Sequence, residues 1–290
     1  MRRLWVNSET SRLRQVIIGN PERFELAGPI NPKLERLALG AGDLPTQETL
    51  IPEFAALRAA LESRGVEVMQ PSPLDGVPDQ LTPRDIGFVV GDRFVIANML
   101  TPCRREEWRG IESILSTMSP ERIVRPPADV TLEGGDVVLD RGVLYVGLSE
   151  RTSSGGAAFL AETFGDEYEV VPVPLRTTAE GEDVLHLDCA FVPVGERSAI
   201  IYPPGLREIP PRLRAEYDWI EVDREQQHEL ATNVLSIAPD LVVSRDLSHA
   251  VNAEMRNRGI EVIELPFHGT PDCGGSFRCA SLPLTRDLQL

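Results

Sequence analysis

Short apolar runs recur along the chain in pairs, with the two members of each pair separated by a turn. Each run has four to six residues and is rich in Val, Ile, Leu and Phe, which is typical of strands. Because only two to four residues separate the members of a pair, the pattern predicts β-hairpins. The predicted pairs are 85–90 with 93–97, 136–139 with 143–146, 189–194 with 199–202, and 234–237 with 241–244.

A helical pattern and one further strand follow most of these hairpins. The expected helices are 104–118, 153–164 and 247–258, and a shorter one lies near 211–217. The strands expected after the three longer helices are 122–124, 168–171 and 261–264. The chain therefore repeats a β-β-α-β unit with a period near 50 residues, which is typical of propellers and arrays.

The two ends of the chain supply a fifth unit. Residues 278–284 are expected to pair with 13–18, and the helix 46–63 and the strand 66–69 complete the unit. Joining strands from the two ends would close a ring and protect the edges of the sheets. The predicted fold class is therefore α/β, a five-bladed α/β propeller of ββαβ units, with one continuous domain over 1–290.

The charge balance narrows the classes of partner. The chain of 290 residues carries 29 Lys and Arg against 45 Asp and Glu, a net charge of −16. Nucleic acids and anionic membranes attract cationic surfaces, so we expect neither as a partner. The first residues lack the apolar stretch of a secretory leader, and the expected location is cytoplasmic. A homo-oligomer is left open, because the sequence does not reveal a subunit interface.

The cysteines do not form a metal or disulfide pattern. The chain has four of them, at 103, 189, 273 and 279, without a C-x-x-C pair. Neither a disulfide framework nor a structural zinc site is therefore expected. Cys189 lies in an apolar run and is expected to be a small buried residue. Cys273 is close enough in sequence to Cys279 to be considered as a resolving thiol.

Residues with catalytic chemistry occur at nearly regular intervals along the repeat. Cys279, Asn233, His186, Glu133 and Asp85 follow one another backwards along the chain at spacings of 46 to 53 residues. This regularity indicates a repeated fold that places one functional side chain per unit at a common centre. A thiol, an imidazole and several carboxylates together suit a planar cation that is attacked at carbon.

Four motifs, taken in order, carry a family resemblance. They are Pro83-Arg84-Asp85, Glu133-Gly134-Gly135-Asp136, His186-Leu187-Asp188 and the Gly-Gly-x-x-Arg-Cys segment 274–279. Together they resemble the guanidino-group modifying superfamily, which comprises arginine deiminases, dimethylarginine dimethylaminohydrolases and amidinotransferases. The resemblance covers most of the chain. It implies a pentein-like fold, a five-bladed α/β propeller, in agreement with the repeat.

The resemblance also implies roles for individual residues. Asp85, Glu133 and Asp188 would hold a guanidinium, since carboxylates accept its N–H groups in charge-assisted hydrogen bonds of about 1.5–3 kcal/mol each. Cys279 would attack the central carbon. A free thiol has a pKa of about 8.5, so a bound cation or a protonated His186 would raise its thiolate fraction. His186 would protonate the leaving amine and later activate water.

Each of these residues also has a structural interpretation. Asp85 and Asp136 could cap turns, Glu133 could be a solvated edge residue, and His186 could be a hydrogen-bonded core histidine. Cys279 taken alone could be a small buried side chain. The joint pattern favours catalytic roles for Cys279 and His186. Asp136 is expected to be structural or to contact the site residues and not the substrate.

Two further segments bear on the substrate. The run 147–152, Gly-Leu-Ser-Glu-Arg-Thr, resembles a dimethylarginine hydrolase pattern whose arginine helps to bind the substrate α-carboxylate. The resemblance therefore implies Arg151 for that role, with a surface arginine as the alternative. The run 231–235 resembles a fourth-unit segment of such enzymes, in which Asn233 is expected to be an architectural hydrogen-bonding residue.

The chain departs from that hydrolase in two places. It has Ile-Ala-Asn-Met at 96–99 where the hydrolase would show Ile-Thr-Arg-Pro, and Arg104 and Arg105 are candidates for the missing positive charge. The acid of His186-Leu187-Asp188 is similar to deiminases and amidinotransferases. Such an acid would favour an unsubstituted guanidinium terminus, because methyl groups remove donors.

These observations favour a cysteine-dependent hydrolase of the guanidino group of arginine or a related compound, acting through a covalent thiouronium on Cys279. An amidinotransferase is the alternative. A non-catalytic guanidino-binding propeller is disfavoured by the intact Cys279 and His186. A metal-dependent hydrolase is disfavoured because no multi-His cluster is present. No cofactor is expected, since neither a Gly-x-Gly-x-x-Gly run nor a P-loop occurs.

Overall fold

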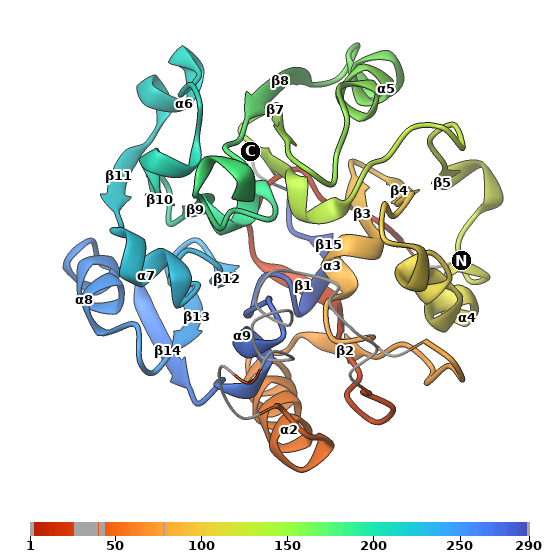
Figure 1. Cartoon of the computed structure of the whole chain (residues 1–290), viewed down its shortest axis with the longest axis horizontal. Helices are drawn as coiled ribbons and strands as arrows, with labels where there is room; N and C mark the ends of the chain where they lie inside the picture. Colours follow the sequence, from red (N-terminus) through yellow and green to blue (C-terminus); the bar gives the residue numbers. More distant parts are fainter. Residues whose placement is uncertain (1–2, 26–39, 41–43, 78, 289–290) are drawn as a thin grey trace.

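The computed structural model describes residues 3–25, 40, 44–77 and 79–288. Within these residues, five three-stranded sheets surround a common centre (Figure 1). In each sheet two antiparallel strands are followed by a third strand parallel to the second. The predicted propeller of ββαβ units is therefore confirmed.

Each sheet takes its strands from one unit of the repeat. The first sheet contains β3 (Gly87–Val90), β4 (Arg93–Ile96) and β5 (Ile123–Val124), and the second contains β6 (Val137–Asp140), β7 (Val143–Leu148) and β8 (Glu169–Pro174). The third contains β9 (Phe191–Val194), β10 (Ser198–Ile201) and β11 (Asp218–Glu221), and the fourth contains β12 (Leu235–Ala238), β13 (Leu241–Arg245) and β14 (Glu261–Leu265). The fifth contains β15 (Ser281–Arg286), β1 (Leu13–Ile18) and β2 (Glu67–Met69).

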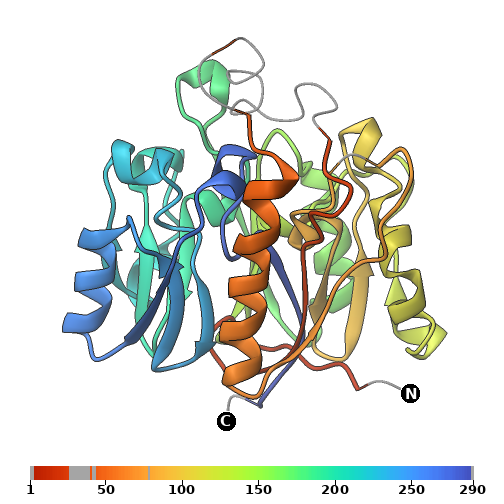
Figure 2. The same ribbon diagram turned by 90° about the horizontal axis from the view of Figure 1, so that it is seen from below.

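Helices between the second and third strands of the units lie on the outside of the ring (Figure 1). They are α2 (Gln47–Ser63), α4 (Glu112–Leu115), α5 (Ser154–Phe164), α6 (Pro211–Glu216) and α8 (His249–Asn257). Figure 2 shows α2 running alongside the strands. The other short helices and 3-10 turns are α3 (Pro83–Ile86), α7 (Arg224–His228), α9 (Gly269–Asp272), η1 (Pro102–Arg104), η2 (Glu107–Ile111), η3 (Pro120–Arg122), η4 (Gly134–Asp136), η5 (Thr178–Glu180), η6 (Leu187–Cys189) and η7 (Pro203–Gly205).

The ring closes through the pairing of β1 with β15. The two strands run antiparallel, from Leu13 opposite Arg286 to Ile18 opposite Ser281. The predicted closure is therefore confirmed, although the predicted strand 278–284 begins too early. The residues before Ser281 form a turn instead, in which the backbone N–H of Ala280 donates to the carbonyl of Ser276.

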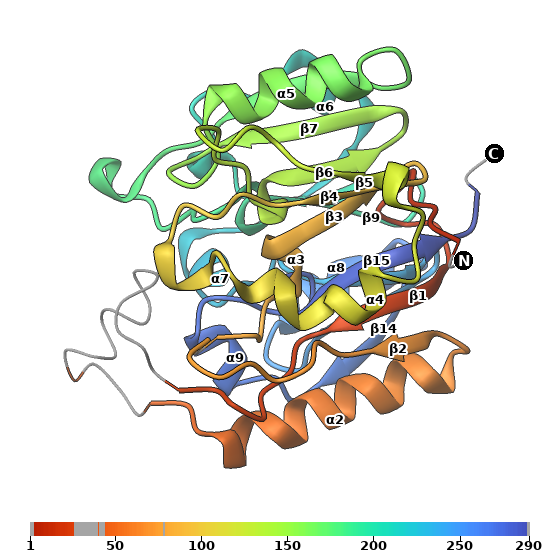
Figure 3. The same cartoon turned by 90° about the vertical axis from the view of Figure 1, so that its right-hand side faces the viewer.

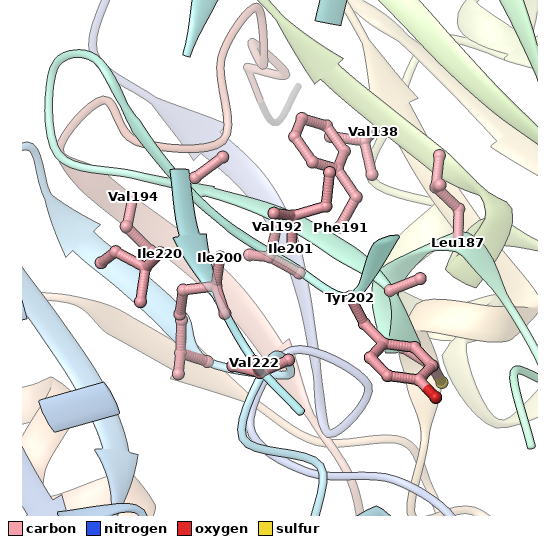
Figure 4. Packing of buried hydrophobic residues seen from close by; sticks show 14 of the residues in the cluster. Val138, Leu187, Phe191, Val192, Val194, Ile200, Ile201, Tyr202, Ile220 and Val222 are labelled. Atoms are coloured by element: carbon pink, nitrogen blue, oxygen red, sulfur yellow. The ribbon is translucent and has the colours of Figure 1, made fainter. Parts of the chain in front are cut away.

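The first two strands of the units are largely buried, whereas the third strands are partly exposed. Phe191 in β9 packs edge-to-face against Tyr145 in β7, with ring centroids 5.6 Å apart. Figure 4 shows Phe191 near Val138, in the cluster that joins the second and third units. Strands buried on two sides read as nearly continuous apolar runs, which is the pattern seen in the sequence.

One predicted helix is wrong. Residues 104–118 form 3-10 turns followed by the single short helix α4. A Cβ at Gly110 would lie 2.4 Å from Nε2 of Gln80 and 3.0 Å from both Cβ of Pro71 and the carbonyl oxygen of Ser72, so other segments pack closely against the backbone here. Arg104 also forms an ion pair with Glu107. Close packing and this pairing, rather than local helix propensity, define the segment.

The helices of the described ranges do not include one that is both long and apolar enough to cross a membrane.

The ring closure predicts an asymmetric effect of two leucine substitutions. Leu282 in β15 is fully buried and lies opposite Ile17 of β1. Leu282→Ala is therefore expected to lower the free energy of unfolding by about 2–5 kcal/mol in denaturant titrations. Leu288, which is 53% exposed, provides the control. Leu288→Ala should change the free energy of unfolding by less than about 0.5 kcal/mol. Equal effects would contradict the closure.

Candidate active site

The residues just before the first strand of each unit meet near the centre of the ring. Asp85 precedes β3, Glu133 precedes β6, Asp188 precedes β9, Asn233 precedes β12 and Cys279 precedes β15. The turn η4 contacts both α3 and η6, and α3 also contacts β15. In Figure 3, α3, α7 and α9 lie toward the same end of the strands. The regular sequence spacing thus corresponds to one position repeated in five units.

Cys279 is buried and held from two sides. Its Sγ accepts a hydrogen bond from Nδ2 of Asn233 at 3.1 Å and donates one to Oδ2 of Asp188 at 3.4 Å. The loop before it is closely packed, because a Cβ at Gly275 would lie 2.7 Å from Cγ2 of Thr82 and 2.9 Å from Cβ of Cys279. Only a glycine fits at this position of the loop.

The surroundings of Cys279 disfavour its charged form. Burial raises the pKa of the thiol well above its usual range, and the negative charges of Asp188 and Asp85 raise it further. The positive charge of Arg278 opposes these effects without overcoming them. Cys279 is therefore a neutral thiol at pH 7 in the ligand-free protein.

A buried ion-pair chain supports Asp188. Its Oδ2 accepts a hydrogen bond from Nη1 of Arg278 at 2.8 Å, and Nη2 of Arg278 donates to Oε1 of Glu9 at 2.8 Å. Burial would raise the pKa of Glu9, but Arg278 and Arg84 lower it to about 2. Asp188 is thus held in position by Arg278, which is itself paired with Glu9, a residue shortly before β1. Neither Glu9 nor Arg278 was among the predicted site residues, since neither contact shows in a local motif.

His186 lies between two carboxylates. Its Nε2 is 2.9 Å from Oε2 of Glu133, and its Nδ1 is 3.7 Å from Oδ1 of Asp85. Burial alone would lower the pKa of His186, but Asp85, Asp136 and the hydrogen bond to Glu133 raise it to about 9. The ring is therefore an imidazolium at pH 7. A Cβ at Gly135 would lie 2.5 Å from its Nδ1, which accounts for a glycine there.

Asp85 has one occupied and one unoccupied oxygen. Oδ2 accepts hydrogen bonds from Nη1 of Arg104 at 2.8 Å and Oγ1 of Thr82 at 3.0 Å. Oδ1 is buried and has no hydrogen-bond partner among the described residues. Burial would raise the pKa of Asp85, but the charges of His186 and Arg104 outweigh it and lower the pKa. An ionised oxygen at the centre of the ring is thus left for a donor.

Arg104 and Arg105 both lie beside the site, in different roles. Arg104 is buried and donates to Asp85, and it also forms a forked pair with Glu107 at 2.8 Å for both bonds. Arg105 donates to the backbone carbonyls of Met99 and Leu100. The positive charge of Arg104 is therefore already engaged by two carboxylates of the protein.

Glu133 and Arg151 are neighbours. The carboxylate accepts a hydrogen bond from the backbone N–H of Leu100 at 3.0 Å on Oε1, and its Oε2 faces His186. Nη1 of Arg151 is 3.7 Å from the same Oε2 and donates to Oγ1 of Thr101 at 2.7 Å. Arg151 is buried, so the alternative of a solvated surface arginine does not hold.

Asp136 supports the turn that carries His186. Its Oδ1 accepts the backbone N–H of Leu187 at 2.9 Å, and its Oδ2 accepts the hydroxyl of Ser149 at 2.6 Å. Burial raises the pKa of Asp136 to about 7, although the charge of His186 acts in the opposite direction. A Cβ at Gly147 would lie 2.3 Å from Oδ1, which explains the glycine that opens the Gly-Leu-Ser segment.

The remaining candidates lie outside this arrangement. None of the four cysteines, all of which lie in the described ranges, forms a disulfide, and Cys273 is buried. His268 has a half-exposed side chain 3.6 Å from Asp246. In the described part of the chain, no group of three or more His, Cys, Asp or Glu side chains has an arrangement that could hold a metal ion.

The chain is similar in sequence to a described family and to individual known proteins. A family model described as "N,N dimethylarginine dimethylhydrolase, eukaryotic" matches residues 33–286. An uncharacterized protein, YkgA of Bacillus subtilis, is 34% identical over 282 residues, which cover 96% of this chain and 94% of that protein. An arginine deiminase of Rhodococcus opacus is 28% identical over 254 residues, which cover 74% of this chain and 62% of the deiminase.

Solved structures show the same fold. An amidinotransferase of Microseira wollei superposes with a TM-score of 0.80 at 20% identity, covering 99% of this chain and 98% of that one. The N-terminal domain of an arginine dihydrolase from cyanobacteria gives a TM-score of 0.81 at 21% identity, covering 94% of this chain and 97% of that one. The fold is thus that of the guanidino-group modifying enzymes. The chain belongs to this superfamily and, within it, to the family described by the dimethylarginine dimethylhydrolase model.

The raised pKa of Cys279 predicts slow alkylation at neutral pH. In a Cys103→Ser background, the rate with iodoacetamide should rise with pH and still be rising above about pH 9, because only the thiolate reacts. Mass-spectrometric peptide mapping would follow the modification at Cys279, and Cys279→Ser provides the control. A rate that levels off below pH 8 would contradict the neutral thiol.

Proposed function

We propose that this protein is a cysteine-dependent hydrolase of the guanidino group of arginine or a close relative, acting through a covalent thiouronium on Cys279. The observation that carries the proposal is the buried Oδ1 of Asp85, which has no hydrogen-bond partner among the described residues. This carboxylate acts electrostatically on both His186 and Cys279. A buried oxygen without a donor is costly, and a guanidinium would supply the donor beside the thiol.

Two acids would hold the substrate. Oδ1 of Asp85 accepts one N–H group of the guanidinium, and Oδ1 of Asp188 accepts another. Within the described residues, Oδ1 of Asp188 has only the weak thiol donor of Cys189, at 3.7 Å. Glu133 has protein donors on both oxygens. It is therefore better suited to orient His186 than to bind the guanidinium directly. This role differs from the one that the resemblance implied, in which Glu133 holds the guanidinium.

In the first half-reaction, the positive charge of the substrate activates the thiol. A bound guanidinium offsets the negative charges of Asp188 and Asp85, which lowers the pKa of Cys279 and releases the thiol proton to solvent. The thiolate attacks the central carbon and a C–S bond forms. Protonated His186 donates its proton to the departing nitrogen as the C–N bond breaks. Ammonia or an alkylamine leaves, and a thiouronium remains on the sulfur.

The second half-reaction uses the same histidine in its neutral form. His186 accepts a proton from water, and the resulting hydroxide adds to the thiouronium carbon. The C–S bond then breaks, the electron pair returns to sulfur, and the hydroxyl proton passes to that sulfur as the carbonyl forms. The ureido product departs, and the enzyme returns with neutral Cys279 and protonated His186. Water replaces one nitrogen of the substrate.

Turnover should depend on Cys279. Purified protein would be incubated with arginine, methylated arginines, agmatine and guanidino acids, with and without glycine as an amine acceptor, and the products identified by mass spectrometry. We expect a ureido product from at least one compound, loss of that product in Cys279→Ser, and no effect of a chelator.

The other outcomes of this screen separate the alternatives. A product that appears only with glycine and carries the amidino group would identify an amidinotransferase. Activity that a chelator abolishes would contradict the thiol mechanism. If folded protein binds these compounds without converting any of them, the hydrolase proposal is wrong and a guanidino-binding role replaces it.

Arg151 is the proposed ligand of the substrate carboxylate, because it is buried next to Glu133 at the site. Arg151→Met is expected to lower kcat/KM for an α-amino acid substrate such as arginine about tenfold or more, since a charged hydrogen bond contributes about 1.5–3 kcal/mol. Agmatine lacks the carboxylate and serves as the matched substrate. Steady-state kinetics with the two compounds would test the role, and equal losses for both would exclude carboxylate binding.

A further inference from the structure

Asn233 holds the segment that carries the nucleophile. Its backbone carbonyl accepts the N–H of Arg278 at 3.2 Å. Its side-chain Oδ1 accepts the N–H of Ser276 at 3.1 Å and that of Cys279 at 3.0 Å. Its Nδ2 lies 3.1 Å from Sγ of Cys279. One residue of the fourth unit therefore contacts both the backbone and the reactive atom of the fifth.

The orientation of this amide follows from its partners. Backbone N–H groups can only donate, so the atom that faces Ser276 and Cys279 must be the amide oxygen. The NH₂ group is consequently directed at Sγ of Cys279, with the backbone carbonyl of Asp188 as a second acceptor at 3.4 Å. A flipped amide would place two donors against two donors. The side chain thus offers the sulfur an N–H group and cannot offer it an oxygen.

The backbone around Asn233 is shaped to hold it there. Leu230, three residues earlier, has a φ of 58°, a left-handed conformation that is costly for a leucine and is often found at functional sites. Thr232 donates its hydroxyl to the backbone carbonyl of Cys189 at 3.0 Å. The turn is therefore tied to the third unit as well as to the nucleophile loop, and the amide is buried.

We propose that Asn233 is a catalytic residue, whose side-chain N–H donates to the sulfur of Cys279 and stabilises the thiolate. The inference rests on the proposed function, because it takes Cys279 as the reacting atom. Hydrogen bonds to a charged acceptor are stronger than those to a neutral one. The same donor favours the formation of thiolate before attack and its departure when the C–S bond breaks. The sequence favoured an architectural role for Asn233, and its two backbone acceptor contacts fit that role too.

Two substitutions separate the donor from the architecture. Asn233→Asp keeps an oxygen for the N–H groups of Ser276 and Cys279 but replaces the donor to sulfur. Asn233→Leu removes both functions and adds no charge. Asn252→Asp is the matched control, because Asn252 is another buried asparagine in the fourth unit, hydrogen-bonded to Arg245 and Glu264 instead of a thiol.

The readout is the pH dependence of iodoacetamide alkylation at Cys279, measured without substrate and together with the thermal midpoint. Both Asn233 variants are expected to raise the pKa of the thiol by about one unit or more, which lowers the alkylation rate at pH 8 about tenfold. Asn252→Asp should leave this rate unchanged. A folded Asn233→Leu protein with the wild-type profile would overturn the proposal, whatever the effect on stability.

A measurement on the unsubstituted protein covers the case in which neither variant folds. The side-chain amide resonances of Asn233, followed by ¹⁵N NMR, should shift with the same midpoint as the titration of Cys279, and the shift should vanish in Cys279→Ala. Resonances that do not respond to the thiol would overturn the proposal. Neither experiment needs turnover, so the two failures are distinguishable: an inactive protein would contradict the proposed function, whereas an unchanged thiol titration would contradict the stabilisation of the thiolate by Asn233.

Discussion

The structure depends on one constraint, that the first strand of every unit begins at the centre of the ring. The residues before these strands are therefore buried together, and buried charges are stable only when they are paired or hydrogen-bonded. Arg104 accordingly binds Asp85, and Arg278 binds Asp188. Asp85 and Asp188 each keep one carboxylate oxygen that is available to a ligand. The arrangement that satisfies the buried charges also defines the site.

Electrostatics at this centre distinguishes the two reactive groups. The acids raise the pKa of His186 to about 9 against the effect of burial, whereas burial first and the acids second raise the pKa of Cys279 well above its usual range. In the described residues the thiol and the imidazole share no hydrogen bond, so they do not form a preassembled thiolate–imidazolium pair. A cationic substrate would change this balance at Cys279. Reactivity at neutral pH would then increase when a guanidinium occupies the site, which limits the reaction of the thiol with other reagents.

Much of the fold could be predicted from the sequence, because apolar runs and turns are local features repeated in every unit. The regular spacing likewise indicated that Asp85, His186 and Cys279 share one centre. The pairings could not be predicted: Arg278 and Glu9 are 269 residues apart in sequence, and their contact exists only after the ring has closed. The same holds for Glu133, whose position against His186 depends on how the second and third units pack. Local helix propensity failed at 104–118, where close contacts with other segments determine the backbone.

The central claim is that Cys279 attacks the guanidino carbon and keeps most of the substrate bound to sulfur. Quenching the enzyme in acid during turnover and measuring the mass of the intact protein would test it directly. The mechanism predicts an adduct on Cys279 with the mass of the substrate less the departing ammonia or alkylamine. An adduct that carries only the amidino group would indicate transfer chemistry. Turnover with no adduct at Cys279, under conditions in which S-alkyl thiouronium compounds survive, would contradict the mechanism.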